Sequence, residues 1–309
     1  MSAALRSLIA APAPEVAPLP PAAHCAPGVR LLRGVPYAVP DGSRPLELDL
    51  WLPGEATEGT AGGTAGGTVG GPVPLVLYVH GGAWRIGRRD DMGMRLRDWE
   101  PGPFARIAAA GIAVACVDYR LSGEAHFPAP LDDLRAALRW LALRSAELGI
   151  DTARTVVWGE SAGGHLASLL ALTGSAPGHT GPSPAGAVIW YGPSDLTTAR
   201  GGWDPWDAAT PEAALLGAAP ATVPDLARAA SPVMHAHAGA PPFLLVHGDA
   251  DTMVSSTHSH ALAARLEAAG ASADLWTVPG ADHGWYGASD EQVTEIFTRS
   301  LGFVERLVR

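Results

Sequence analysis

Cysteines and long apolar runs are scarce in this chain. Only Cys25 and Cys116 occur among the 309 residues, and two cysteines neither require nor exclude an oxidising compartment. Cys116 lies in the apolar run 112–117, which is typical of a buried strand. We therefore interpret it as an inert core thiol and do not expect a disulfide with Cys25. No run of 18 or more apolar residues is present, so the sequence predicts no membrane-spanning helix.

Basic residues are also few. The chain has 21 Lys and Arg against 31 Asp and Glu, a net charge of −10, which argues against nucleic acid and an anionic membrane as partners. It has neither a Gly-x-Gly-x-x-Gly turn after a strand nor a P-loop, so no nucleotide cofactor is expected. The histidine pairs at 235/237 and 258/260 lack cysteine or acidic neighbours at metal-ligand spacing, so we expect no metal and no other cofactor.

The first 28 residues are rich in alanine and proline. The apolar stretch after Arg6 ends at Pro12 and is shorter than the apolar core of an export signal. We interpret residues 1–28 as a partly extended or mobile arm and residues 29–309 as one domain, and we expect a cytoplasmic protein.

Strand patterns come first along the chain and then alternate with helical patterns. Residues 29–35 and 46–52 are predicted strands, and the second alternates leucine with other residues, as a strand with one buried face does. The clearest predicted helix spans 130–148, and two more span 256–269 and 290–308. This order predicts an α/β protein with a mostly parallel sheet of about eight strands and helices on both faces.

Two segments depart from this alternation. Residues 55–72 form a Gly/Thr/Ala-rich stretch that we interpret as a loop without a functional role. Residues 195–231 are rich in Ala, Pro, Gly and Trp, and we interpret them as a small cap-like insertion over the active site. Trp203 and Trp206 would then line an acyl or aromatic pocket, or alternatively only pack the insertion onto the body.

The most informative motif is Gly-Glu-Ser-Ala-Gly at 159–163, between an apolar strand pattern and a helical pattern. A serine in such a strand-to-helix turn is held in a tight bend that exposes its hydroxyl, and the flanking glycines leave room for the bend. Ser161 is therefore the candidate nucleophile. A helix N-cap is the alternative role for this serine.

A serine nucleophile needs a histidine base and an acid that orients it. On this kind of sheet the acid and then the histidine follow the serine along the chain, after later strands. We expect Asp251 to be the acid, with Asp249 bracing the turn, and His283 to be the base. The histidines at 258 and 260, near a helix start, are expected at the surface.

The sequence His-Gly-Gly-Ala-Trp at 80–84 follows another apolar strand pattern. Small side chains there leave backbone N–H groups free to bind a developing oxyanion. In hydrolases of this type, one N–H comes from this loop and another from the residue after the nucleophile, here Ala162.

These motifs, in this order, resemble the α/β-hydrolase superfamily, in its hormone-sensitive-lipase and feruloyl-esterase-like (esterase/lipase) branch. The resemblance runs from about residue 30 to the C-terminus and implies an α/β-hydrolase fold. It assigns the loop N–H donors to Gly82 and Ala83, with Gly81 as the turn residue. Ala83 and Trp84 stand where the lipase-type pattern has a further glycine, and this variant is similar to small-acyl esterases and arylformamidases.

We therefore expect a serine hydrolase that cleaves carboxylic esters, with short acyl groups, by way of an acyl-enzyme. An arylformamidase or other amide hydrolase, an acyl transferase or cyclase, and a non-catalytic binding protein are the alternatives. The expected partner is a small-molecule ester, and a homo-oligomer is left open. The candidate substrate-binding residues are Trp84, Glu160, Trp203, Trp206 and Trp285.

Overall fold

The computed structural model describes residues 12–54, 71–199 and 203–309. The predicted loop 55–72 lies almost entirely outside these ranges. Within them, a nine-stranded sheet has the order β1-β2-β3-β5-β4-β6-β7-β8-β9. Its strands are β1 Ala23–Ala26, β2 Val29–Ala38, β3 Leu46–Pro53, β4 Val73–Val79, β5 Ala113–Val117, β6 Ile150–Glu160, β7 Gly186–Trp190, β8 Phe243–Gly248 and β9 Ala273–Val278.

The sheet is antiparallel at its N-terminal edge and parallel elsewhere. The pairs β1–β2, β2–β3 and β3–β5 are antiparallel, whereas all pairs from β5 through β4 to β9 are parallel. The predicted mostly parallel α/β sheet is therefore confirmed, with one strand more than the eight expected. The additional strand is β1, which lies within the segment interpreted as an arm.

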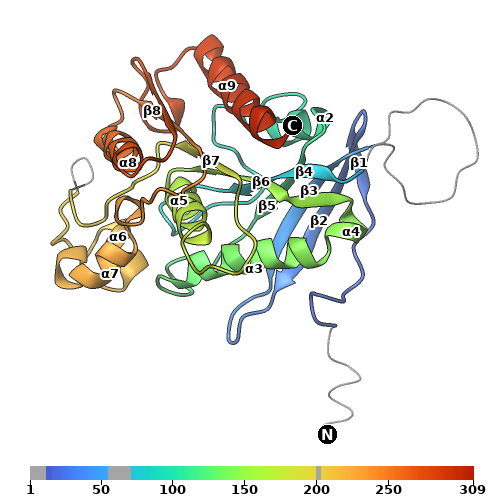
Figure 1. Ribbon diagram of the computed structural model, residues 1–309, viewed down its shortest axis with the longest axis horizontal. Helices are drawn as coiled ribbons and strands as arrows, with labels where there is room; N and C mark the ends of the chain where they lie inside the picture. Colours follow the sequence, from blue (N-terminus) through green and yellow to red (C-terminus); the bar gives the residue numbers. More distant parts are fainter. Residues whose placement is uncertain (1–11, 55–70, 200–202) are drawn as a thin grey trace, which may run out of the picture.

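Helices cover both faces of the sheet, with α2 and α9 on one face and α3, α5 and α8 on the other (Figure 1). The described helices are α2 Pro103–Ala109, α3 Ala129–Leu143, α4 Ser145–Leu148, α5 Ala162–Gly174, α6 Pro211–Leu216, α7 Pro224–Ala229, α8 Thr257–Ala268 and α9 Asp290–Val308. The single helix predicted over 130–148 is thus divided into α3 and α4. In the described parts of the chain, no helix is long and apolar enough to cross a membrane.

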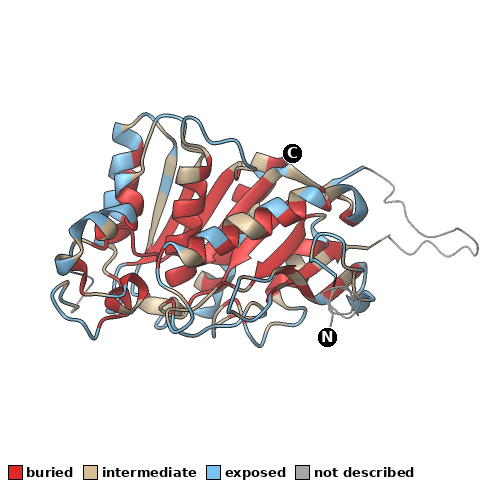
Figure 2. Cartoon of the chain, turned by 90° about the horizontal axis from the view of Figure 1, so that it is seen from below, coloured by how far each residue is buried: buried red, intermediate tan, exposed pale blue. Residues whose placement is uncertain are grey.

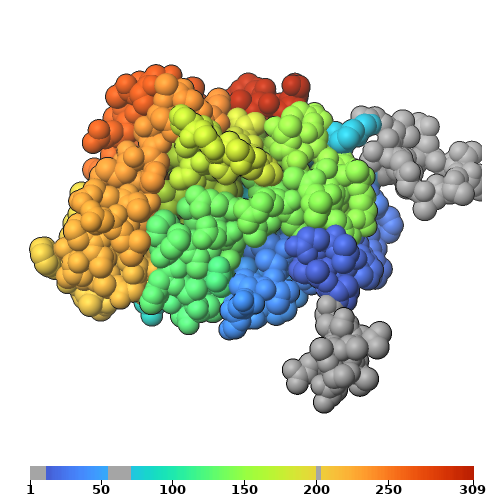
Figure 3. Space-filling view, turned by 60° about the horizontal axis from the view of Figure 1, so that its bottom comes forward, coloured from blue at the N-terminus to red at the C-terminus, as the bar shows by residue number. Residues whose placement is uncertain are grey.

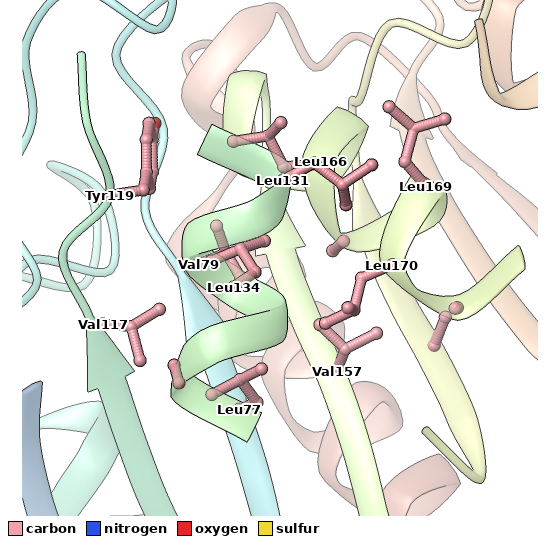
Figure 4. Packing of buried hydrophobic residues seen from close by; sticks show 14 of the residues in the cluster. Leu77, Val79, Val117, Tyr119, Leu131, Leu134, Val157, Leu166, Leu169 and Leu170 are labelled. Carbon is pink, nitrogen blue, oxygen red and sulfur yellow. The ribbon is translucent and has the colours of Figure 1, made fainter. Parts of the chain in front are cut away.

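The core consists of two apolar layers separated by the sheet. Along β4, Leu77 and Val79 face the cluster beneath α3 and α5, whereas Val76 and Tyr78 face the opposite cluster. This alternation follows from the two-residue repeat of a strand. Figure 4 shows leucines of α3 and α5 packed over β4 and β6, and the strands from β3 to β8 are buried along most of their length (Figure 2). The site therefore rests on a sheet covered on both faces.

Residues 12–28 of the predicted arm lie against the body of the domain (Figure 3). The indole N–H of Trp140 donates to the carbonyl oxygen of Pro14 at 2.9 Å, and the Arg144 guanidinium donates to that of Ala17 at 3.1 Å. This part of the segment contains a turn, in which the N–H of Ala17 donates to the carbonyl oxygen of Ala13 at 2.9 Å, followed by β1, and it is held by α3 and the residue that follows it. The remainder of the predicted arm, residues 1–11, lies outside the described residues.

Candidate active site

Ser161 lies in the bend between β6 and α5. Its φ of 50° and ψ of −121° place it outside the allowed region of an ordinary L-residue. Its backbone N–H donates to the carbonyl oxygen of Trp190 at 2.9 Å, and its own carbonyl oxygen accepts from the N–H of His165 at 3.0 Å. These bonds to β7 and to the first turn of α5 hold the strained conformation that the sequence motif predicted.

The two glycines of the motif are required by close backbone contacts. A Cβ atom on Gly159 would lie 2.3 Å from the carbonyl oxygen of Gly163, and a Cβ on Gly163 would lie 2.1 Å from that of Val79. Since real Cβ atoms do not approach oxygen this closely, any larger residue would separate α5 from β4 and β6. The Gly-x-Ser-x-Gly pattern therefore reflects packing as well as the turn.

The structure brings Ser161, His283 and Asp251 into one hydrogen-bonded line. The Ser161 hydroxyl donates to Nε2 of His283 at 2.9 Å, and Nδ1 of His283 donates to Oδ2 of Asp251 at 2.8 Å. Asp251 follows β8, and His283 follows β9. Both strands run parallel to β6, so the three residues meet at the carboxyl edge of the sheet, where such sheets place ligands.

Asp251 is buried and surrounded by donors. Its Oδ1 accepts from the N–H groups of Met253 and Val254 at 2.9 and 2.7 Å, and its Oδ2 lies 3.2 Å from Nε2 of His247. Burial opposes ionisation, but hydrogen bonds from His247 and His283 hold the pKa of Asp251 below its usual range. Asp251 is thus an anion that can orient a histidine.

Asp249 and His247 make hydrogen bonds that hold the loop carrying Asp251. Asp249 accepts from the N–H of Gly280 at 2.7 Å and joins the loops after β8 and β9, as its predicted bracing role requires. His247 of β8 donates to the carbonyl oxygen of Val254 at 2.8 Å and also contacts the carboxylate of Asp251. Sequence reasoning missed the contact with Asp251.

The loop after β4 lies beside Ser161. The N–H of Gly81 points to Oε1 of Glu160 at 3.4 Å, so it is engaged within the protein, in agreement with a turn role. Within the described ranges, no group accepts a hydrogen bond from the N–H of Gly82, Ala83 or Ala162. These three donors border the same cavity as Ser161, where a developing oxyanion could use them.

A cavity of about 450 Å³ opens beside Ser161. Of the candidate substrate-binding residues, Trp84, Glu160 and Trp203 line it. The prediction was wrong for the other two candidates. Trp206 is 70% exposed and does not line the cavity, and Trp285 is buried in the core against Trp190 and Tyr191. The full lining consists of Gly81, Gly82, Ala83, Trp84, Arg85, Ile86, Gly93, Met94, Glu160, Ser161, Ala162, Tyr191, Pro193, Trp203, Pro211, Met253, Val254, His283 and Gly284.

Glu160 and Tyr191 form a buried pair next to Ser161. The Tyr191 hydroxyl donates to Oε2 of Glu160 at 2.6 Å, and the Tyr191 ring lies 4.7 Å from the His283 ring, centroid to centroid. Burial raises the pKa of both the Glu160 carboxyl and the Tyr191 hydroxyl. Through the Gly81 N–H, this pair connects the oxyanion loop to the histidine. Sequence reasoning missed Tyr191, although it follows β7 at the same sheet edge.

Trp84 also contacts a buried histidine. Its indole N–H donates to Nδ1 of His165 at 3.2 Å, and Nε2 of His165 donates to the carbonyl oxygen of Ala230 at 2.6 Å. Burial lowers the pKa of His165 to about 4, so the imidazole is neutral near pH 7. It connects the oxyanion loop, α5 and the end of the 195–231 segment.

The described residues offer no metal site. They contain no group of three or more His, Cys, Asp or Glu side chains arranged to hold an ion. Both cysteines are free thiols.

The sheet order and the turn after β6 define an α/β-hydrolase fold. A family model described as BD-FAE matches residues 67–266, more than half of the chain, so the chain belongs to this family.

Known relatives agree with this assignment. Esterase LipQ of Mycobacterium tuberculosis is 30% identical over 81% of this chain and 56% of its own length, and Esterase LipC of that organism is 30% identical over 69% and 53%. The chain thus spans about half the length of these curated relatives. Among solved structures, a truncated carbohydrate esterase from gut microbiota matches with a TM-score of 0.69 and 28% identity, covering 88% of this chain and 96% of that chain.

We predict that Tyr191→Phe lowers kcat about tenfold and changes KM little, because the Glu160 carboxylate loses its hydroxyl donor and no longer fixes the oxyanion loop. Steady-state kinetics on an ester substrate would measure this. Tyr37→Phe is the matched control, since it removes a buried tyrosine hydroxyl bond to the Asp118 carbonyl, away from the cavity. Equal kcat losses in the two variants would contradict the assignment.

The low pKa of His165 also predicts how stability depends on pH. Between about pH 6.5 and pH 4, the unfolded chain binds a proton at His165 that the folded chain does not. Stability therefore falls as the pH falls through this window, by about 3 kcal/mol in total. Urea unfolding of His165→Asn, which has an acceptor for Trp84 but no titrating ring, should show a shallower fall. Replacement of the exposed His24 by Asn should leave the wild-type slope, and a wild-type slope in His165→Asn would refute the prediction.

Proposed function

We propose that this chain hydrolyses carboxylic esters, with Ser161 as nucleophile, His283 as general base and acid, and Asp251 as the residue that orients His283. The observation that carries the proposal is the hydrogen-bonded line from Ser161 through His283 to Asp251, at a strained turn on an apolar cavity. The relatives named as esterases support the reaction class.

In the first half-reaction, Nε2 of His283 takes the proton of the Ser161 hydroxyl while Oγ bonds to the ester carbonyl carbon. The carbonyl oxygen becomes an oxyanion within reach of the N–H groups of Gly82, Ala83 and Ala162. The bond between the carbonyl carbon and the alcohol oxygen then breaks. His283 gives its proton to that oxygen, and an acyl group remains on Ser161.

In the second half-reaction, a water molecule gives a proton to His283 and its oxygen bonds to the acyl carbon. The bond to Oγ of Ser161 then breaks, Oγ recovers the proton, and a carboxylic acid leaves. The Asp251 carboxylate stabilises the imidazolium in both halves without taking its proton. An amide hydrolase or an acyl transferase would share the first half-reaction, but the relatives' names favour ester hydrolysis.

The acyl group we propose is short. Ala83 and Trp84 replace the glycine of lipase-type oxyanion loops, and an ethyl acetate hydrolase of Pseudomonas putida is 38% identical over 31% of this chain and 28% of its own length. Residues 195–231 would act as a small cap, since Trp203 and Pro211 of this segment line the cavity.

We predict that Ser161→Ala lowers kcat on p-nitrophenyl acetate by at least about 1,000-fold, because Ser161 is the only serine, threonine or cysteine among the described residues that line the cavity. Initial rates on p-nitrophenyl acetate, butyrate and octanoate would measure both this loss and the acyl preference. Ser168→Ala, on the buried side of the same helix, should leave activity near that of the wild type. Wild-type turnover by Ser161→Ala would overturn the proposal.

A further inference from the structure

Four large apolar side chains are exposed at the mouth of the cavity. Ile86, Met94 and Met253 line it and are 70%, 55% and 46% exposed, and Tyr286, 48% exposed, donates its hydroxyl to Sδ of Met94 at 3.4 Å. We name these four residues the apolar rim. Only nine large apolar side chains of the described chain are exposed to this degree, so nearly half of them gather at one opening. Such clustering indicates a surface that binds an apolar ligand.

Three of the four rim residues are connected to the segments that carry Asp251 and His283. Met253 is two residues after Asp251, Tyr286 follows three residues after His283, and Met94 contacts Tyr286. In the proposed reaction, His283 gives its proton to the leaving alcohol oxygen, so that oxygen must lie within hydrogen-bond reach of Nε2. Since Met253, Met94 and Ile86 line the same cavity as His283, an alcohol that extends out of the cavity from this position can contact the rim.

The polar side chains at the cavity are too few to bind a sugar. Among the described residues, only Arg85, Glu160, Ser161 and His283 contribute charged or hydrogen-bonding side chains other than aromatic ones to the lining. Glu160 is engaged by Tyr191 and Gly81, Arg85 is exposed, and Ser161 and His283 are used by the reaction. A sugar alcohol would therefore find few ordered hydrogen-bonding side chains here, whereas an apolar alcohol would remove the exposed rim from water.

We propose that the leaving alcohol of the natural ester is uncharged, apolar and large enough to reach past the cavity onto the apolar rim, as an aryl or branched alkyl alcohol is. This inference rests on the proposed ester hydrolysis and adds the class of alcohol to it. The acyl group stays inside the cavity, and the rim binds the alcohol.

The test compares acetates of different alcohols. Phenyl acetate and 2-naphthyl acetate share an acyl group and have leaving groups of similar basicity, and acetylated methyl xyloside supplies a sugar alcohol. Met94→Gln should lower kcat/KM for 2-naphthyl acetate about fivefold and for phenyl acetate less than twofold, because only the larger alcohol reaches the rim. Met234→Gln is the matched control, since Met234 is 45% exposed and does not line the cavity. It should leave both values unchanged.

The other outcomes overturn the inference. Equal losses on the two aryl acetates, the same effect from Met234→Gln, or faster hydrolysis of the xyloside acetate than of 2-naphthyl acetate would each do so. The inference would also be overturned if Met94→Gln lowered kcat/KM on p-nitrophenyl esters by a factor that grows with acyl length. The rim would then bind the acyl group.

A binding measurement distinguishes failure of this inference from failure of the proposed reaction. Failure of the reaction would appear as no hydrolysis of any ester by the wild type. The affinity for 2-naphthol, followed by its own fluorescence, needs no turnover. Met94→Gln should weaken this binding about fivefold relative to Met234→Gln, and equal affinities would overturn the rim assignment.

Discussion

The positive φ of Ser161 is the constraint on which the rest of the site depends. It persists because α5 passes so close to β4 and β6 that only glycine fits at positions 159 and 163. The close approach directs the serine hydroxyl to the carboxyl edge of the sheet. It also places the N–H of Ala162 beside the loop that follows β4. Backbone packing thus sets the positions of the proposed nucleophile and the proposed oxyanion donors together.

Two buried carboxylates flank this turn, and each is stabilised differently. Asp251 is held by two backbone N–H groups and contacts two histidines, so its charge is available to His283. Glu160 has a tyrosine hydroxyl and one long contact from Gly81, and burial raises its pKa. In the proposed reaction, the carboxylate with more hydrogen-bond donors, Asp251, orients His283. The Glu160 carboxyl group instead contacts the loop after β4. The two carboxyl groups differ in this way because Asp251 accepts more hydrogen bonds than Glu160 does.

The sequence predicted the parts of the site that short motifs carry, and missed those that depend on long-range packing. Ser161, Asp251 and His283 each follow a strand pattern, so their meeting at one sheet edge could be anticipated. Tyr191 has no motif of its own. Trp285 was expected at the cavity, but the loop after β9 turns its ring into the core. The histidine at 258 was expected at the surface and is buried, where its Nδ1 accepts from the N–H of residue 194 at 3.2 Å.

Labelling with a fluorophosphonate, followed by mass spectrometry of the digested protein, measures directly whether the fold makes Ser161 an activated nucleophile. We expect one phosphonyl group per folded chain, on the peptide that contains Ser161, and none after denaturation or in Ser161→Ala. Labelling of a different residue, or no labelling of the folded protein, would contradict the proposed role of Ser161.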